Sequence, residues 1–363
     1  MTSRSSRNRP GRARLTGLIA LASLGAALTA CGTGGRATTG GPATGSASHP
    51  PATKVAPAAS VRTVPPGPTL PGPGALTSSG GVRAGQGRWR PAGRRVRGRV
   101  AIYETTLVPP GGTRAAGIAW MDTRLLAARL YSGSLSPGGG PYRFTAPVRP
   151  AQASTLVAAF NGGFKMRDAR GGYYTEGRTV VPLVRGAASL VIYSGGSVGL
   201  GAWGSDVTMT RAVVSVRQNL VPLVADGRPT PLVTTRTWRF WGSTCSATSC
   251  GHGLPGVEHQ WRSGLGITAD GALVYTAGPA LDPLQLAQLL IRAGAVRAME
   301  LDINPAWPVF ASYAPASPAN LAAPSNGSKL LASADHGPDT FFNPSWARDF
   351  ITMSARPAGS TAG

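Results

Sequence analysis

The sequence predicts an α+β protein: a single domain with mixed or antiparallel sheet and few helices, preceded by a disordered tether. Residues 1–99 carry fifteen Arg and Lys and no carboxylate, whereas residues 100–363 carry twenty-one against fourteen carboxylates. From residue 100 on, short apolar runs rich in Val, Ile and aromatic residues alternate with Gly-containing turns, which is typical of strands. We therefore expect the folded domain to span residues 100–356, with a disordered tail at 357–363.

Residues 1–30 are typical of a lipoprotein signal peptide. Five arginines precede the uncharged stretch LTGLIALASLGAALTA, which is too short for a comfortable membrane span. The stretch leads into LTAC, which resembles a bacterial lipobox. Cleavage before Cys31 and lipidation of that residue would anchor an exported protein to the extracytoplasmic face of the cell membrane. A plain secretory signal with an incidental cysteine is the alternative.

Residues 31–99 are predicted to be disordered. Residues 32–82 consist mainly of Gly, Pro, Ala, Ser and Thr, which bury too little apolar surface to offset the entropy of ordering. Seven arginines follow between Arg83 and Arg99, and an anchored segment of that charge would lie against anionic headgroups or wall polymers. Export argues against nucleic acid as the partner of these arginines.

Two further cysteines, Cys245 and Cys250, are separated by four residues in the stretch STCSATSC. In an exported chain such a pair predicts one small disulfide loop. Two cysteines without convergent histidines are a weak zinc signal. We predict no cofactor, although the oxygen atoms of Glu300, Asp302 and Asn304 would suit a divalent cation.

Several segments have the composition of strands. They are RVAIYET, AAGIAWM, STLVAAFN, ASLVIYS, AVVSVRQNLVPLV, GLGITADGALVYTAG and DFITMSA. Within the sixth, Asp270-Gly271 between two apolar stretches predicts a hairpin.

One helix has clear boundary signals. Asp282 is a suitable N-cap, Pro283 suits the first helical position, Gln285 completes a capping box, and Gly294 can end the helix. Its apolar residues recur at helical spacing, which gives it a face to bury. The helix leads directly into the segment AVRAMELDI, which we interpret as a central strand.

Glu300 and Asp302 lie two positions apart in that strand and therefore share one face. Two buried carboxylates need partners, because an unpaired charge in an apolar interior costs several kcal/mol. Pro305 cannot continue a central ladder, so Asp302 should lie near the end of the strand. Arg262 is a natural partner. The pair either forms a structural ion network or binds a sugar phosphate, since guanidinium binds phosphate oxygens bidentately.

A third landmark is Asn161-Gly162-Gly163, at the end of an apolar strand. Glycines let the backbone bend, so the asparagine amide and neighbouring N–H groups could face an oxyanion. An ordinary turn is the alternative.

Four segments, in their order and spacing, resemble the phosphodiester glycosidase family. They are AAFNGGF, RSGLGITADGALVYTAG, AVRAMELDIN and WARDFITM. That family includes an enzyme that removes N-acetylglucosamine from a phosphodiester, and many bacterial exopolysaccharide-associated proteins. The resemblance covers residues 100–355 and implies hydrolysis of a sugar-1-phosphodiester.

The resemblance implies catalytic roles for Asn161, Arg262 and Asp302, with Gly162 and Gly163 beside the first. The chain departs from the family pattern after Asp302, where the family has a glycine-rich run and this chain has INPAW. Trp307 could instead provide a stacking platform for a sugar ring, or it belongs to the core.

Other candidates are weaker. Glu176 lies in a Gly-rich loop and is a plausible second carboxylate, or merely a solvated acid. His252, His259 and His336 could act as general acids or bases, because imidazole titrates near neutral pH. Each is more often a structural hydrogen-bonding residue.

The sequence therefore predicts a monomeric, membrane-anchored hydrolase that cleaves a sugar-1-phosphodiester linkage in a cell-envelope glycan or glycolipid. Asp302 would act on water or on the sugar, Arg262 would hold the phosphate, and Glu300 would be the second acid or the partner of Arg262. Two alternatives remain: a non-catalytic lipoprotein that binds an anionic wall polysaccharide, and a structural envelope protein that uses only its basic tether.

Overall fold

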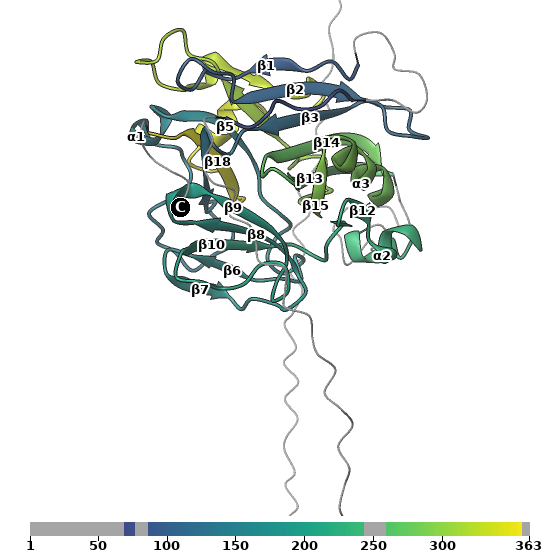
Figure 1. The fold of residues 1–363 in the computed structure, drawn as a ribbon. Coiled ribbons are helices and arrows are strands. Elements are labelled where there is room, and N and C mark those ends of the chain that lie inside the picture. Colours follow the sequence, from purple (N-terminus) through teal and green to yellow (C-terminus); the bar gives the residue numbers. More distant parts are fainter. Residues whose placement is uncertain (1–68, 77–85, 243–258, 358–363) are drawn as a thin grey trace, which may run out of the picture. The chain divides into compact units, whose positions relative to one another are not determined.

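A computed structural model describes residues 69–76, 86–242 and 259–357. It confirms the predicted fold class, because antiparallel sheets dominate and the helices are few and short (Figure 1). Residues 1–30, for which a signal peptide is predicted, lie outside the described residues, as do Cys31, Cys245, Cys250 and His252.

The described strands form three sheets, of eight, five and five strands. In spatial order the large sheet contains β1 (Arg90–Ala92), β2 (Ile102–Leu107), β3 (Ala116–Met121), β14 (Leu273–Leu281), β13 (Gln260–Thr268), β15 (Ala295–Glu300), β11 (Val224–Ala225) and β12 (Arg228–Pro229). The β10 sheet contains β7 (Arg178–Val181), β6 (Tyr173–Thr175), β10 (Val213–Gln218), β8 (Ala188–Tyr193) and β9 (Val198–Ala202). The β5 sheet contains β17 (Gly327–Lys329), β16 (Phe310–Tyr313), β5 (Leu156–Asn161), β18 (Phe350–Ala355) and β4 (Leu126–Tyr131).

The helices are α1 (Pro150–Ala153), α2 (Pro231–Thr234) and α3 (Pro283–Arg292), with 3-10 turns η1 (Ser194–Gly196), η2 (Trp238–Trp241), η3 (Pro324–Asn326) and η4 (Pro338–Phe342). No helix within the three described ranges is long and apolar enough to cross a membrane.

The main apolar core joins all three sheets. It combines Leu265, Tyr275 and Met299 of the large sheet with Phe160 and Ile351 of the β5 sheet and Leu190 and Leu200 of the β10 sheet. Burial of each large apolar side chain contributes roughly 1.5–3 kcal/mol. The three sheets therefore hold one another in place, and polar groups at their junction are fixed from three sides.

Helix α3 covers the opposite face of the large sheet. Its N-terminus carries the predicted capping box, in which the Asp282 carboxylate accepts from the Gln285 amide and the Gln285 side chain accepts from the Asp282 amide. Its buried residues, including Leu286 and Leu290, pack against β13, β14 and β15. The predicted hairpin is also confirmed, since β13 and β14 pair antiparallel and Gly271 has a positive φ of 94°.

The folded part begins before residue 100, earlier than composition suggests. β1 pairs with β2, and Val96 lies in the main core. Residues 69–76, which we call the strap, lie on the same face of the large sheet as α3, where Leu70 and Leu76 pack in the cluster that contains Trp120. The two leucines of the strap, in a segment otherwise rich in Pro and Gly, pack with this apolar surface of β3, which is distant in sequence.

Candidate functional site

Three arginine–carboxylate pairs lie where the three sheets meet. They are Arg262–Glu300 at 2.8 Å, Arg348–Asp302 at 2.8 Å and Arg217–Asp349 at 2.7 Å. All six side chains are at least nine-tenths buried, but to different depths. This polar centre contains the catalytic residues expected from the sequence and several that were not expected.

The Arg262–Glu300 pair is sealed, with both side chains at 0% exposure. Register explains the contact, because β13 and β15 are neighbours and Gly264 lies opposite Glu300. The Arg262 guanidinium also donates to the backbone oxygens of Trp241 and Leu281. The hydrogen bonds of Arg262 thus go to other groups of the protein, as expected for a member of a structural ion network.

Burial raises the pKa of Glu300 to about 7, and the Arg262 guanidinium opposes that rise. Only Oε2 of Glu300 bonds to Arg262, and among the described residues the buried Oε1 has no hydrogen-bond partner. A carboxylate at this depth cannot meet a polysaccharide without a rearrangement of α3 or the sheet.

Asp302 lies two residues beyond the last residue of β15, and its carboxylate is held by three donors. Oδ1 accepts from the backbone N–H groups of Ile303 and Asn304 at 2.8 and 3.0 Å, and Oδ2 accepts from Arg348. Burial raises the pKa of Asp302, while Arg348 and the two amides oppose the rise. The side chains of Asp302 and Arg348 are each 5% exposed, so this pair is also buried but lies slightly nearer the surface than Arg262–Glu300.

Aromatic rings surround the outer side of Arg348. Its Cζ lies 4.9 Å from the Trp307 ring centroid, and Trp307 is stacked on His336 at 6.3 Å. Trp346 contacts both rings at 5.3 and 4.9 Å. Trp307 and His336 are only half-buried, so this aromatic rim forms the boundary between the polar centre and solvent.

Two hydrogen-bond donors at this boundary are unused. Within the described part of the chain, Arg348 Nε and Trp346 Nε1 are buried and lack partners. A buried donor without an acceptor costs about 1–3 kcal/mol. Such donors suit the oxygen atoms of a bound molecule or water.

Asn161 points inward and its amide is fully engaged. Its Nδ2 donates to Ser263 Oγ and to the Gly162 oxygen, and its Oδ1 accepts from Tyr275 Oη and the Val309 amide. The amide therefore connects β5, β13 and β14, and has no donor left for an oxyanion.

The glycines after Asn161 are required by close packing. A Cβ at Gly162 would collide with the Asp349 carboxylate, and one at Gly163 would lie 2.5 Å from Asn219 Oδ1. Neither residue has a positive φ. The two glycines thus leave room for the Arg217–Asp349 pair to approach the end of β5. This differs from the predicted role, in which the glycines let the backbone bend around an anion.

Within the described residues, the side chains of the other site residues predicted from the sequence make contacts with nearby backbone or side chains and do not meet the Asp302 carboxylate. The Glu176 carboxylate accepts from the amides of Arg143 and Phe144 at 3.0 Å each. His259 is exposed and lies 3.6 Å from Asp282 at the start of α3. The Asn304 side chain accepts from the Ala306 amide and so shapes the turn that follows Asp302.

No group of three or more His, Cys, Asp or Glu side chains within residues 69–76, 86–242 and 259–357 is placed to hold a metal ion. Glu300 and Asp302 each face an arginine, and Asn304 Oδ1 already accepts from the backbone. These residues therefore do not form a cation cage in this arrangement.

The sequence reasoning missed Arg217, Asn219, Arg348 and Asp349. Asn219 donates to the backbone oxygens of Glu300 and Leu301, and Arg348 also donates to the Gly163 oxygen. A signal was present, because Arg217 lies in an apolar strand run and the Arg348-Asp349 pair directly precedes another. Charged residues in such positions indicate a buried ion pair.

Comparisons with known proteins give only distant similarity. No protein-family model matches the chain, and no curated protein matches it. The catalytic domain of zebrafish N-acetylglucosamine-1-phosphodiester alpha-N-acetylglucosaminidase, auto-inhibited by its pro-peptide, has a TM-score of 0.41 and 15% identity, covering 74% of this chain and 88% of that chain.

Two bacterial structures are weaker matches. A hypothetical protein from Synechocystis has a TM-score of 0.36 and 12% identity over 71% of this chain and 63% of that chain. A protein from Burkholderia pseudomallei K96243 described as exported has a TM-score of 0.31 and 12% identity over 66% of this chain and 74% of that chain. The functional argument below rests on the site and not on these similarities.

Proposed function

We propose that this protein is an exported, membrane-anchored hydrolase that cleaves a sugar-1-phosphodiester linkage in a cell-envelope glycan or glycolipid. The supporting observation is the Asp302–Arg348 pair, which lies just beneath the surface beside the half-buried rings of Trp307 and His336. An arginine, a carboxylate and an aromatic ring suit the three parts of such a substrate: its phosphate, its anomeric carbon and its sugar ring.

Arg348 is the phosphate-binding residue in this proposal. Its Nε is an unused donor, and a guanidinium binds phosphate oxygens in a fixed fork. Arg262, which the sequence favoured for this role, is at 0% exposure and donates to the backbone instead. We therefore assign phosphate binding to Arg348 instead of Arg262.

Trp307 would carry the sugar. The apolar face of a pyranose matches the face of an indole ring, and Trp307 keeps part of its surface in solvent. The same ring lies against Arg348, so a sugar on Trp307 would place its anomeric oxygen close to the guanidinium.

Asp302 would act at the anomeric carbon. In the reaction the bond from C1 to the phosphate oxygen breaks, the oxygen of water bonds to C1, and the water proton passes through the carboxylate to solvent. Phosphate leaves without protonation when a guanidinium holds it, so one carboxylate suffices to stabilise the oxocarbenium-like centre or activate water.

Glu300, Arg262 and Asn161 would act as positioning residues. Asn161 donates to Ser263 Oγ, and that hydroxyl accepts from the Asp302 amide at 3.1 Å. The backbone of Ser263 also pairs with Leu301 and Asp302. This framework fixes the segment that carries Asp302.

A second candidate is a non-catalytic lipoprotein that binds an anionic glycan. It is favoured by one observation: both oxygens of Asp302 already accept hydrogen bonds, which weakens a carboxylate as a base. This candidate uses the same arginine and aromatic rim but predicts no product.

The test is to incubate the purified full-length chain with UDP-glucose and UDP-N-acetylglucosamine, and to measure free reducing sugar and UDP. Asp302→Asn keeps the side-chain shape and should lower kcat by at least about 100-fold. Arg348→Lys keeps the charge but loses the fork, and should raise KM. Asp206→Asn, a partly exposed acid in the β10 sheet region, is the matched control.

Turnover by Asp302→Asn equal to that of the native protein would refute the catalytic assignment. Binding of the sugar nucleotide with no release of sugar over hours would support the binding lipoprotein instead. Anchoring is tested separately, since Cys31→Ser should abolish incorporation of labelled palmitate and release the protein from the membrane fraction.

A further inference from the structure

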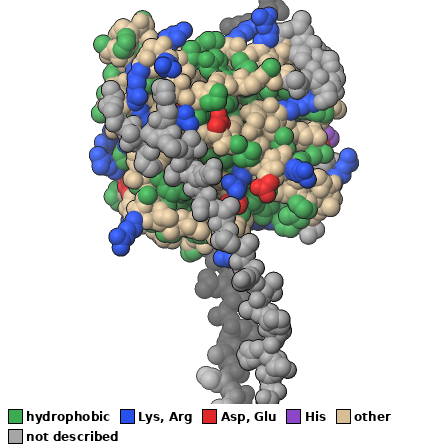
Figure 2. Space-filling model, viewed as in Figure 1, with side chains coloured by type: hydrophobic (Ala, Val, Ile, Leu, Met, Phe, Trp, Pro, Cys, Tyr) green, Lys and Arg blue, Asp and Glu red, His purple; other side chains and the backbone are tan. Residues whose placement is uncertain are grey.

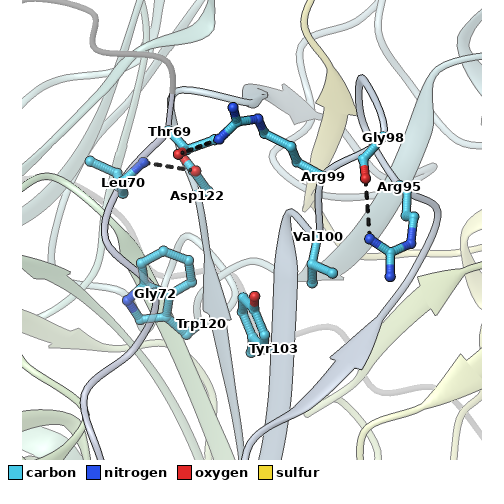
Figure 3. A pocket seen from close by; sticks show the side chains of 10 residues that line it. All are labelled: Thr69, Leu70, Gly72, Arg95, Gly98, Arg99, Val100, Tyr103, Trp120 and Asp122. Carbon is cyan, nitrogen blue, oxygen red and sulfur yellow. Dashed lines mark hydrogen bonds between the residues drawn. The ribbon is translucent and has the colours of Figure 1, made fainter.

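A pocket of about 330 Å³ lies at one edge of the large sheet, away from the arginine–carboxylate pairs. Its walls come from the strap, from the loop that joins β1 to β2, and from the ends of β2 and β3 (Figure 3). The lining residues are Thr69, Leu70, Gly72, Arg95, Gly98, Arg99, Val100, Tyr103, Trp120 and Asp122.

The pocket and the Asp302 site lie at opposite ends of the large sheet. Ala116, at the start of β3, lies beside Gly278 of β14, and Gly278 lies opposite Arg262 of β13. These three residues therefore form the row across the sheet that is nearest Asp302. Asp122 follows Met121, the last residue of β3. The full length of β3 therefore separates the two sites, and neither shares a lining residue with the other.

Two aromatic rings form the base of the pocket. The ring centroids of Tyr103 and Trp120 are 6.1 Å apart and their planes are inclined by 62°. In Figure 3 the hydroxyl of Tyr103 points toward the space between Arg99 and Trp120. No hydrogen bond involves that hydroxyl within the described part of the chain. Trp120 is 3% exposed, so the half-buried Tyr103 supplies most of the accessible apolar surface and the one polar group, which suits a sugar ring.

The rim of the pocket is positively charged. Arg95 and Arg99 are exposed, and each makes a single side-chain hydrogen bond, to Gly98 oxygen and Thr69 Oγ1 respectively. Each guanidinium therefore keeps several donors for an anion. Basic side chains also outnumber acidic ones on the face shown in Figure 2, so an anionic ligand would be attracted to the molecule as a whole.

The one carboxylate in the pocket does not cancel this charge at the rim. Asp122 accepts from the backbone N–H groups of Leu70, Arg124 and Leu125 at 3.0, 2.8 and 3.3 Å. These contacts hold the strap against the sheet, together with a bond from Arg124 to the Thr69 oxygen. Asp122 thus serves to fix the pocket wall.

We infer that this pocket binds a small ring-bearing anion of the sugar-phosphate class. The phosphate would lie at the positively charged rim beside the Arg99 guanidinium, and the ring would pack on the half-buried Tyr103, next to its hydroxyl. A volume of about 330 Å³ is at the lower end of small-molecule pockets and fits one sugar ring with its phosphate. This site goes beyond the proposed hydrolase and would hold a charged glycan unit without cleaving it.

The experiment is calorimetric titration of the full-length chain with glucose 6-phosphate, with glucose and inorganic phosphate as separate probes. The double variant Arg95→Gln/Arg99→Gln should bind glucose 6-phosphate at least about tenfold more weakly. Arg211→Gln removes one exposed positive charge next to β10 and should bind as the native chain does. Asp302→Asn should leave this affinity unchanged.

A local readout assigns the binding to this pocket. Hydrogen exchange at residues 69–76 should slow when glucose 6-phosphate is present in the native chain, and should not change in the double variant. The double variant should still hydrolyse UDP-sugars if the proposed function is right, so the two proposals can fail independently.

Three results would overturn the inference. The first is no binding of glucose 6-phosphate up to about 10 mM. The second is equal affinity for inorganic phosphate and glucose 6-phosphate, which would show that the ring contributes nothing. The third is native affinity in the double variant.

Discussion

Glu300 and Asp302 lie two residues apart, and each faces an arginine at 2.8 Å, yet their surroundings differ. Glu300 and Arg262 are enclosed between the large sheet and α3, at 0% exposure. Asp302 and Arg348 lie beyond the end of the strand, where half-buried aromatic rings replace the sheet as neighbours. The first pair is enclosed on all sides, whereas the second has half-buried aromatic rings as neighbours.

The difference comes from the strand end. Inside β15, β13 pairs along the strand from Ala295 to Glu300, and β11 pairs on the other side at Ala298. At Asp302 the ladder stops, and the turn through Asn304 and Pro305 leads the chain out to Trp307. The sheet therefore fixes the base of this pair, and a loop rather than another strand covers it from outside.

The largest expected effect is a difference in the free energy of unfolding when the arginine of each pair, Arg262 or Arg348, is replaced. Arg262→Met leaves Glu300 buried without its partner and should lower the free energy of unfolding by about 3–5 kcal/mol. Arg348→Met should cost only roughly 1–3 kcal/mol, because two backbone amides still bind Asp302 and water can approach it. Urea titrations followed by circular dichroism measure both values.

Arg211→Met, at an exposed arginine, controls for the loss of a charge and should change stability by less than about 0.5 kcal/mol. Equal losses in Arg262→Met and Arg348→Met would remove the distinction between a structural and an accessible pair.

The next prediction concerns binding at the accessible pair. Trp307→Ala removes the ring that would carry the sugar, and should raise KM for a UDP-sugar by about tenfold with a smaller change in kcat. Trp307→Phe retains an aromatic face and should recover part of the loss. Steady-state kinetics measure these values.

Trp203→Ala, at a half-buried tryptophan next to β9, is the matched control and should leave KM unchanged. An unchanged KM in Trp307→Ala would show that this ring belongs only to the core.

Local sequence signals account for the elements that could be predicted. The helix at 283–292 and the hairpin at Gly271 depend on residues within a few positions of one another, and the structure confirms both. Strand composition likewise found β2, β3, β5, β8, β10, β13, β14 and β18.

The polar centre could be predicted only in part, because its contacts join distant segments. Arg348 meets Asp302 across 46 residues, and Arg217 meets Asp349 across 132. The sequence also could not show that both faces of β13 are covered, which buries Arg262. The strap was missed for the same reason, because its two leucines find their partners, Trp120 and Asp122, about fifty residues along the chain.

The smallest expected effect uses Glu104, a half-buried carboxylate of β2 that forms no ion pair among the described residues. Burial raises its pKa to about 7, a hydrogen bond with Ser312 opposes the rise, and its Oε1 has no partner among the described residues. The folded state therefore holds this proton more tightly than the unfolded state does. The stability that follows is fully present below the unfolded pKa, near 4.5, and is lost as the pH rises through about 7.

Glu104→Gln should therefore flatten the fall in the free energy of unfolding between pH 5 and 8, by on the order of 1 kcal/mol. Glu300, whose pKa burial also raises, would account for part of the slope that remains. Asp168→Asn, at an exposed acid, should leave the slope as it is in the native chain. A native slope in Glu104→Gln would mean that Glu104 is ionised in the folded protein, and would show that burial alone does not set the protonation of a carboxylate in this core.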